Sequence, residues 1–197
     1  MRPQFAFYRK AWDESLAELH KQWGGDFNPG ANIIPPTGEV IFKYASLSTD
    51  IREHKVYLYA TMQYDAAYNH IYVYGKWKSE LILTLESLHD RFLKLIGLEY
   101  EITLAGNEAN IIMFNKKYLI KGEPKEFVSG FLSDYKNQDI IGNLGDFCIL
   151  SLKDNVARLE YELSSEEIVK SDLLSERINY LIDFLLALQK AESEVKS

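Results

Sequence analysis

Hydrophobic residues recur with a helical period near both ends of the chain. Near the N-terminus, the residues of one helical face are Trp12, Leu16, Leu19 and Trp23. This spacing predicts a helix over residues 5–22, which ends before two consecutive glycines. Near the C-terminus, a wider apolar stripe predicts a long helix over 171–192. A helix that is apolar around much of its circumference usually packs between layers or against a partner.

Between these helices the period of the apolar residues changes from 3.6 to two. Segments rich in Val, Ile and Tyr predict strands at 39–47, 55–64, 70–77 and 79–85. In the second strand Tyr57 and Tyr59 share one face, and in the third strand Tyr72 and Tyr74 do the same. A hairpin between these two strands places all four tyrosines on one face of the sheet.

The second half of the chain alternates between strand-like and helix-like patterns. Helices are predicted at 86–97 and from Pro124 to about residue 134, with an irregular polar join at 133–139. Further strands are predicted at 99–104, 109–113 and 116–121. A closing hairpin turns at Asp154-Asn155.

These elements predict an α+β fold in one domain, residues 1–197. Short hairpins dominate, so the sheet is expected to be mainly antiparallel, with an N-terminal helix, two or more mid-chain helices and a long C-terminal helix. The segment 26–38 is rich in Pro and Gly and is expected to be an irregular connection. It either tethers residues 1–25 as a separate helical arm or lays that helix across the sheet.

Charge argues against binding to a nucleic-acid backbone. The formal net charge is −7, and non-specific nucleic-acid affinity comes mainly from neutralising phosphates. The lysines at 116–125 are interpreted as a solvated, protected edge strand rather than a binding patch. No nucleic-acid partner is therefore predicted.

Apolar runs are too short to predict a membrane span, and the charged N-terminus does not resemble a secretory signal. The single cysteine, Cys148, excludes an intrachain disulfide and lies in an apolar run typical of a buried position. A cytoplasmic location is expected.

Sequence motifs for catalysis are missing. The four histidines have no spacing typical of a zinc site, and no nucleophile motif or phosphate-binding loop is present. No catalytic residue, metal ligand or cofactor is predicted.

The best candidate for a binding surface is the predicted tyrosine-rich strand pair. Its residues are Tyr57, Tyr59, Tyr72, Tyr74 and His70, which begins the third strand. Tyrosine offers a large, rigid and amphipathic area, which suits binding. The interpretation that we favour, however, is that these tyrosines are packed beneath the N-terminal helix, whose Trp12 and Trp23 need a surface to cover.

Residues 78–134 resemble a widespread, uncharacterised family of prokaryotic proteins. The family pattern is a strand of the form F-[DN]-x-x-[FY]-x-I-K-[GS] followed by a helix. The matching residues here are Gly97-Leu98, Phe114, Asn115 in place of the usual aspartate, Tyr118 in place of phenylalanine, and Ile120-Lys121-Gly122. The resemblance implies a fold unit, and this family has no established catalytic residues to carry over.

The sequence favours a non-enzymatic protein-binding or adaptor domain, with a homodimer through the C-terminal helix as one form of it. A small-molecule-binding protein or an enzyme, with a site around the tyrosine-rich sheet, is the first alternative. An immunity or anti-defence interaction protein is the second.

Overall fold

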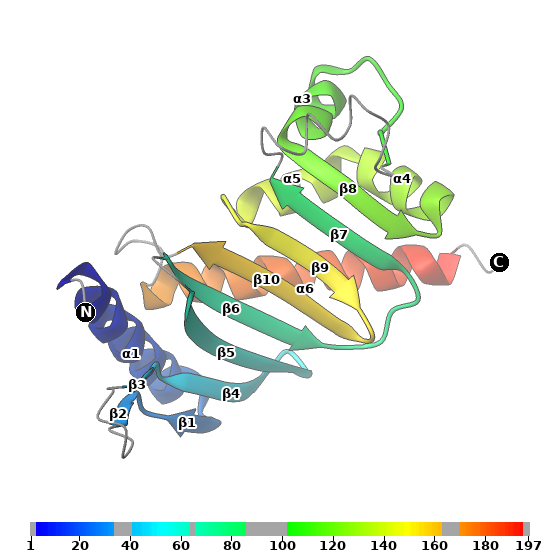
Figure 1. Cartoon of the computed structure of the whole chain (residues 1–197). Coiled ribbons are helices and arrows are strands. Elements are labelled where there is room, and N and C mark those ends of the chain that lie inside the picture. The colour runs from blue at the N-terminus through cyan, green and yellow to red at the C-terminus, as the bar shows by residue number, and fades with distance from the viewer. Residues whose placement is uncertain (1–2, 34–40, 64–65, 86–101, 163–169, 195–197) are drawn as a thin grey trace. The chain divides into compact units, whose positions relative to one another are not determined.

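The computed structural model describes residues 3–33, 41–63, 66–85, 102–162 and 170–194. Over this part of the chain the predicted α+β class is confirmed. Antiparallel strand pairs build an eight-stranded sheet, accompanied by an N-terminal helix, mid-chain helices and a long C-terminal helix (Figure 1). The hydrogen-bonded order of the strands is β1-β4-β5-β6-β10-β9-β7-β8.

The chain divides into two compact units. The first comprises Met1–Tyr74 and Glu160–Ile178, and the second comprises Gly75–Leu159 and Asn179–Ser197. Strand β10 (Val156–Glu162) and helix α6 (Ser171–Glu194) each begin in one unit and end in the other. Neither unit is therefore a single continuous stretch of the chain.

The first unit begins with helix α1, which spans Pro3–Trp23 and confirms the predicted N-terminal helix. Its strands are β1 (Asp26–Asn28), β2 (Ala31–Ile33), β3 (Ile41–Lys43), β4 (Ser46–Ile51), β5 (His54–Gln63) and β6 (Ala66–Tyr74). The expectation of an irregular segment at 26–38 is wrong in part, because β1 pairs with β4 and β2 pairs with β3. These strands are three residues long and are held by backbone pairing. They are too short to show an apolar period in the sequence.

Helix α1 packs on the apolar face of these strands rather than forming a separate arm. Trp12, Leu16 and Leu19 are fully buried, as are Leu47 of β4 and Leu58 of β5. Burying each such side chain contributes roughly 1.5–3 kcal/mol, before the entropy of ordering it is subtracted. This layer is the core of the first unit.

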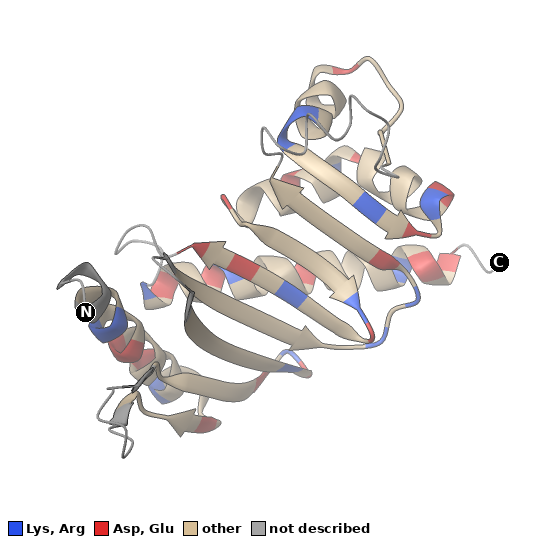
Figure 2. Ribbon diagram, viewed as in Figure 1, with Lys and Arg blue, Asp and Glu red and all other residues tan. Residues whose placement is uncertain are grey.

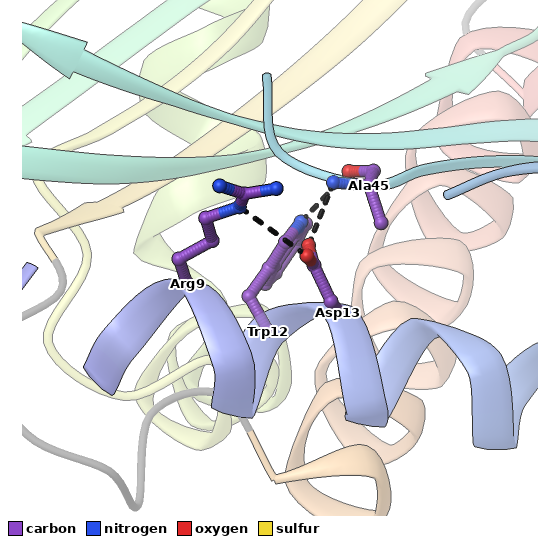
Figure 3. Close-up of polar contacts among 4 residues, drawn as sticks. All are labelled: Arg9, Trp12, Asp13 and Ala45. Atoms are coloured by element: carbon purple, nitrogen blue, oxygen red, sulfur yellow. Dashed lines mark hydrogen bonds and ion pairs between the residues drawn. The ribbon is translucent and has the colours of Figure 1, made fainter. Parts of the chain in front are cut away.

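The backbone of Ala45, just before β4, is held by two side chains of α1 (Figure 3). Trp12 Nε1–H donates to Ala45 O at 2.9 Å, and Ala45 N–H donates to Asp13 Oδ1 at 2.7 Å. Arg9 Nε lies 3.5 Å from Asp13 Oδ2. Side chains of α1 therefore satisfy both backbone groups of Ala45, where no neighbouring strand does so.

The second unit contains the remaining strands and the shorter helices. Its strands are β7 (Glu80–Leu85), β8 (Tyr118–Glu123), β9 (Ile149–Lys153) and the first part of β10. Strand β7 is central, since it pairs with β8 on one side and with β9 on the other. The predicted hairpin turn is confirmed: Asp154 and Asn155 have φ of 51° and 63°, as a two-residue turn between twisted strands requires.

Two further sequence predictions are wrong in the second unit. The strand expected at 109–113 is part of helix α3 (Ala109–Lys117), where Ile111 and Phe114, three residues apart, are buried. The polar join expected at 133–139 begins a helix, α5 (Tyr135–Asn143), after α4 (Lys125–Ser133). The strand expected at 99–104 is not regular from residue 102, and its first residues, like the helix expected at 86–97, lie outside the described residues.

A buried carboxylate ties α6 to the start of β7. Glu192 accepts hydrogen bonds from the Lys78 N–H, the Ser79 N–H and the Ser79 hydroxyl, at 2.7–3.0 Å. Charge-assisted bonds of this kind are about twice as strong as neutral ones. They fix the end of the long helix against the sheet of its own unit.

Asp13 makes the stability of the chain depend on pH. Burial raises the pKa of Asp13 above its ordinary value of 3.8, and this outweighs the opposing effects of the Ala45 N–H and Arg9. The folded chain then binds a proton more readily than the unfolded chain, so the contribution of Asp13 to stability falls as pH rises through the raised pKa. We predict that Asp13→Asn gains stability relative to the wild type as the pH rises from about 4 to about 7.

Urea unfolding of both proteins across this pH range measures the difference. A difference in unfolding free energy that stays constant, or that moves in favour of the wild type with rising pH, would contradict the prediction.

Candidate functional site

The predicted tyrosines do share one face of the β5–β6 hairpin. The register pairs Tyr57 with Tyr72 and Tyr59 with His70, and alternation along β6 adds Tyr74 to the same face. Figure 2 shows both strands uncharged over most of their length. We call these five residues the tyrosine face.

Helix α1 lies on the opposite face, so the expectation that it covers the tyrosines is wrong. The hydroxyl of Thr49, which shares the apolar face of β4, donates to Trp23 O at the end of α1. The apolar face of β4 and β5 already offers α1 enough surface on which to bury its own apolar residues. Tyr57, Tyr59 and Tyr72 remain half-buried, and Tyr74 is 41% exposed.

The rings of the tyrosine face stack mainly on one another. Tyr59 lies 4.6 Å from the His70 ring and 5.5 Å from the Tyr72 ring, centre to centre, with interplanar angles of 25° and 11°. The hydroxyls of Tyr59 and Tyr72 are 3.1 Å apart and share a hydrogen bond. Because the ring faces are partly used internally, this surface offers less free aromatic area than the sequence suggested.

His70 is the one member of the face that is fully buried, at 2% exposure. Its Nε2 lies 2.7 Å from Thr61 Oγ1, and its Nδ1 lies 3.0 Å from Glu160 Oε2. Glu160, on β10, is itself buried. The sequence could not reveal this set, since Glu160 reaches His70 only through the pairing of distant strands.

A second candidate site lies in the second unit, between helices α3 and α5. It is a groove of about 550 Å³. We call it the α3–α5 groove, and it is lined by Asn110, Met113, Phe114, Lys116, Lys117, Tyr118, Tyr135, Gln138, Asp139 and Gly142.

Each wall of the groove is one face of a helix. On α5 the lining residues follow the spacing i, i+3, i+4 and i+7 from Tyr135 to Gly142, and α3 shows the same spacing from Asn110 to Lys117. Met113 is 70% exposed and Tyr135 is 66% exposed. Large apolar side chains are this open on both walls, which is typical of a surface that meets a partner.

Hydrogen bonds hold the two walls in place. Asn110 Nδ2 donates to Gln138 Oε1 across the groove at 2.8 Å, and Gln138 Nε2 donates to Leu132 O at 2.9 Å. Asn137 Nδ2 donates to Phe131 O at 2.8 Å. These amides link α5 to α3 and to the end of α4, so the groove is preformed.

Charge gathers at one end of the groove. The C-terminal end of α3 carries Lys116 and Lys117, blue in Figure 2, and Lys117 Nζ lies 3.0 Å from Asp146 Oδ1. Lys117 also lies 5.3 Å from the centre of the Tyr118 ring. Burial raises the pKa of the Tyr118 phenol, which is therefore neutral near pH 7 and serves as an apolar wall.

The packing around Gly142 does not require a glycine at this position. A Cβ at this position would meet no other atom within 4 Å, although glycine inside a helix costs about 0.5–1 kcal/mol relative to alanine. Because Gly142 has no side chain, the groove reaches the backbone of α5 at this position. Gly130 of α4 is equally unobstructed but lies outside the groove.

Sequence reasoning missed the groove because it placed a strand in one wall and a loop in the other. The signal for α5 was present: Asp134 is an N-cap, since its Oδ1 accepts from the Lys136 N–H at 2.9 Å. Asn137, Gln138 and Ile141 then follow with helical spacing and are buried.

Comparison with known proteins identifies a similar fold but no family. No family model matches the chain, and no curated protein matches it. The crystal structure of the mycobacterial trehalose monomycolate transport factor A, TtfA, is similar, with a TM-score of 0.53 and 15% sequence identity over 95% of this chain and 97% of that one. At this identity the similarity shows a shared fold alone. The resemblance of residues 78–134 to an uncharacterised family stays a prediction.

Two other kinds of feature are missing from the part of the chain that the structure describes. They contain no group of three or more His, Cys, Asp or Glu side chains placed to hold a metal ion. Among the same residues, no helix has the length and apolarity required to cross a membrane.

Asn115, which departs from the usual aspartate of the resembled family, anchors α3. Its Nδ2 donates to Leu104 O at 2.9 Å, and its Oδ1 accepts from the Leu104 N–H at 3.0 Å. Aspartate would set a carboxylate against the Leu104 carbonyl. We therefore predict that Asn115→Asp lowers the free energy of unfolding by about 1–3 kcal/mol at neutral pH.

Urea denaturation checks this value, with Asn28→Asp on exposed β1 as a control that is expected to change it by less than about 0.5 kcal/mol. The loss in unfolding free energy should be smaller at low pH, where the carboxyl introduced by Asn115→Asp is protonated and can donate to the Leu104 carbonyl. Equal effects of the two substitutions would refute the role of Asn115.

Proposed function

We propose that this protein is a non-enzymatic binding module whose α3–α5 groove receives an amphipathic helix of a protein partner. The observation that carries the proposal is the groove itself: two rigid helix faces, an open channel between them, and exposed Met113 and Tyr135 on opposite walls. A helix that lays its apolar face into such a groove is a recurrent mode of peptide recognition.

The residue types at the groove suit a protein rather than a nucleic-acid partner. Methionine and tyrosine are enriched at protein interfaces, and methionine adapts to the shape of the side chains it meets.

The charged residues at the groove indicate which charges a partner helix would carry. In a chain of net charge −7, the groove ends at the lysine pair of α3. Carboxylates beside the apolar face of the partner would meet Lys116 and would share Lys117 with Asp146, whereas lysines there would be repelled by Lys116. We therefore infer a helix with acidic residues flanking an apolar stripe.

Self-association through α6 has less support. The apolar residues of α6 that suggested a homodimer are buried within the chain: Leu174, Ile178, Leu181, Ile182, Phe184, Leu185 and Leu188. Leu186 is 40% exposed, and Leu173 and Tyr180 are partly exposed. The similarity to TtfA supports the fold and adds no partner.

Two labelled synthetic peptides test the proposal. Both are amphipathic helices with the same leucine-rich face, one flanked by glutamates and the other by lysines. Fluorescence anisotropy is expected to show that the acidic peptide binds at least about tenfold more tightly, a difference of ~1.4 kcal/mol. Tyr135→Ala should weaken this binding by a similar factor, because exposed aromatic anchors carry much of such affinity.

A matched pair of glycine substitutions shows where the peptide binds. Gly142→Leu places its Cβ in open space at the groove and should abolish binding, whereas Gly130→Leu makes the same change on α4 and should leave binding intact. Circular dichroism confirms that both variants fold. Binding that survives Gly142→Leu, or that fails for both peptides with the wild type, would overturn the proposal.

A further inference from the structure

The two walls of the α3–α5 groove carry charges of opposite sign. On α3 the charged lining residues are Lys116 and Lys117, and on α5 the charged lining residue is Asp139. All three side chains are exposed. A helix that lies in the groove would therefore have a positive wall along one flank and a negative wall along the other.

One charge on each wall is available to a partner. Lys117 Nζ already lies 3.0 Å from Asp146 Oδ1. Within the described part of the chain, the side chains of Lys116 and Asp139 form no hydrogen bond or ion pair. A partner that covers these two side chains removes part of their hydration, so each favours an opposite charge on the partner.

Two bonds between the walls show how the helices are arranged. Asn110 of α3 bonds to Gln138 of α5. Seven residues further along α3, Lys117 bonds to Asp146, which is eight residues after Gln138. The helices α3 and α5 therefore run in the same direction along the groove. The groove has two different ends, one at Tyr135 and the other at Asp146.

The function proposed above is the basis for a narrower inference about the partner. We propose that the partner helix has carboxylates on the flank that faces α3 and Lys or Arg on the flank that faces α5. Lys116 attracts the first flank and Asp139 attracts the second. The apolar stripe between the flanks packs on Met113 and Tyr135. A helix with carboxylates on both flanks would be repelled by Asp139 on one side.

Opposite charges on the walls also fix the direction of the partner helix. Turning an amphipathic helix end for end, with its apolar stripe still facing the groove, exchanges its two flanks. The reversed helix would set carboxylates against Asp139 and basic side chains against Lys116. The partner therefore binds in one direction relative to α3 and α5.

Peptide affinities test the charge of each flank. The mixed peptide has glutamates on one flank and lysines on the other, and is compared with the peptide that has glutamates on both. Fluorescence anisotropy is expected to show that the mixed peptide binds about fivefold more tightly, with a smaller difference at high salt. Asp139→Asn should remove most of this preference, and Asp139→Lys should reverse it. Asp154→Asn makes the same change of charge at the exposed β9–β10 turn and should keep the preference.

Crosslinking tests the direction. A second mixed peptide has the same composition with its two flanks exchanged, so it should bind with similar affinity but end for end. With a benzophenone on the N-terminus of each peptide, mass spectrometry should locate one crosslink near Tyr135 and the other near Asp146. Crosslinks from both peptides at the same end would overturn the assigned direction.

Failure of this inference differs from failure of the proposed function. Equal affinities of the mixed and glutamate-flanked peptides, or equal effects of Asp139→Asn and Asp154→Asn, would overturn the assigned charges. If Gly142→Leu still abolishes the binding of both peptides, the groove remains the binding site. Should neither peptide bind the wild type, the proposed function and this inference are both wrong.

Discussion

Each buried backbone N–H and C=O that lies outside a helix or strand ladder needs a partner, and this requirement organises the molecule. In the first unit, side chains of α1 take both backbone groups of Ala45, so the helix is fixed to the strand it covers. In the second unit, Asn115 does the same for Leu104, and Glu192 satisfies the backbone where β7 begins. These polar contacts set positions that apolar packing, which has no direction, leaves open.

The same requirement shapes both candidate sites. The amides of α5 are directed inward to backbone carbonyls at the end of α4, and this leaves Tyr135 and Gly142 on its outer face. On the tyrosine face the polar atoms bond to one another, from the hydroxyls of Tyr59 and Tyr72 to the imidazole of His70. The groove is thus preformed and unfilled, whereas part of the tyrosine face is paired internally.

Much of the fold could be predicted from the sequence because its longest elements have clear periods. Helices α1 and α6 and the β5–β6 hairpin follow from apolar spacing alone, and the shared face of Tyr57 and Tyr72 follows from alternation. The groove could not be predicted, since "NIIM" in α3 is too short to distinguish a strand from a helix. Nor could the neighbour of His70, because Glu160 is brought to it by strand order, which local patterns do not contain.

The discontinuous first unit has a consequence for synthesis on the ribosome. Strands β1 to β6 emerge early, yet the unit also needs Glu160–Ile178, which emerge only after most of the second unit. Non-local pairing of this kind is slow, because a long loop must close before its contacts form. The N-terminal strands therefore leave the edge of β6 open to solvent or to chaperones for most of translation. His70 therefore meets Glu160 only after this late segment has joined the first unit.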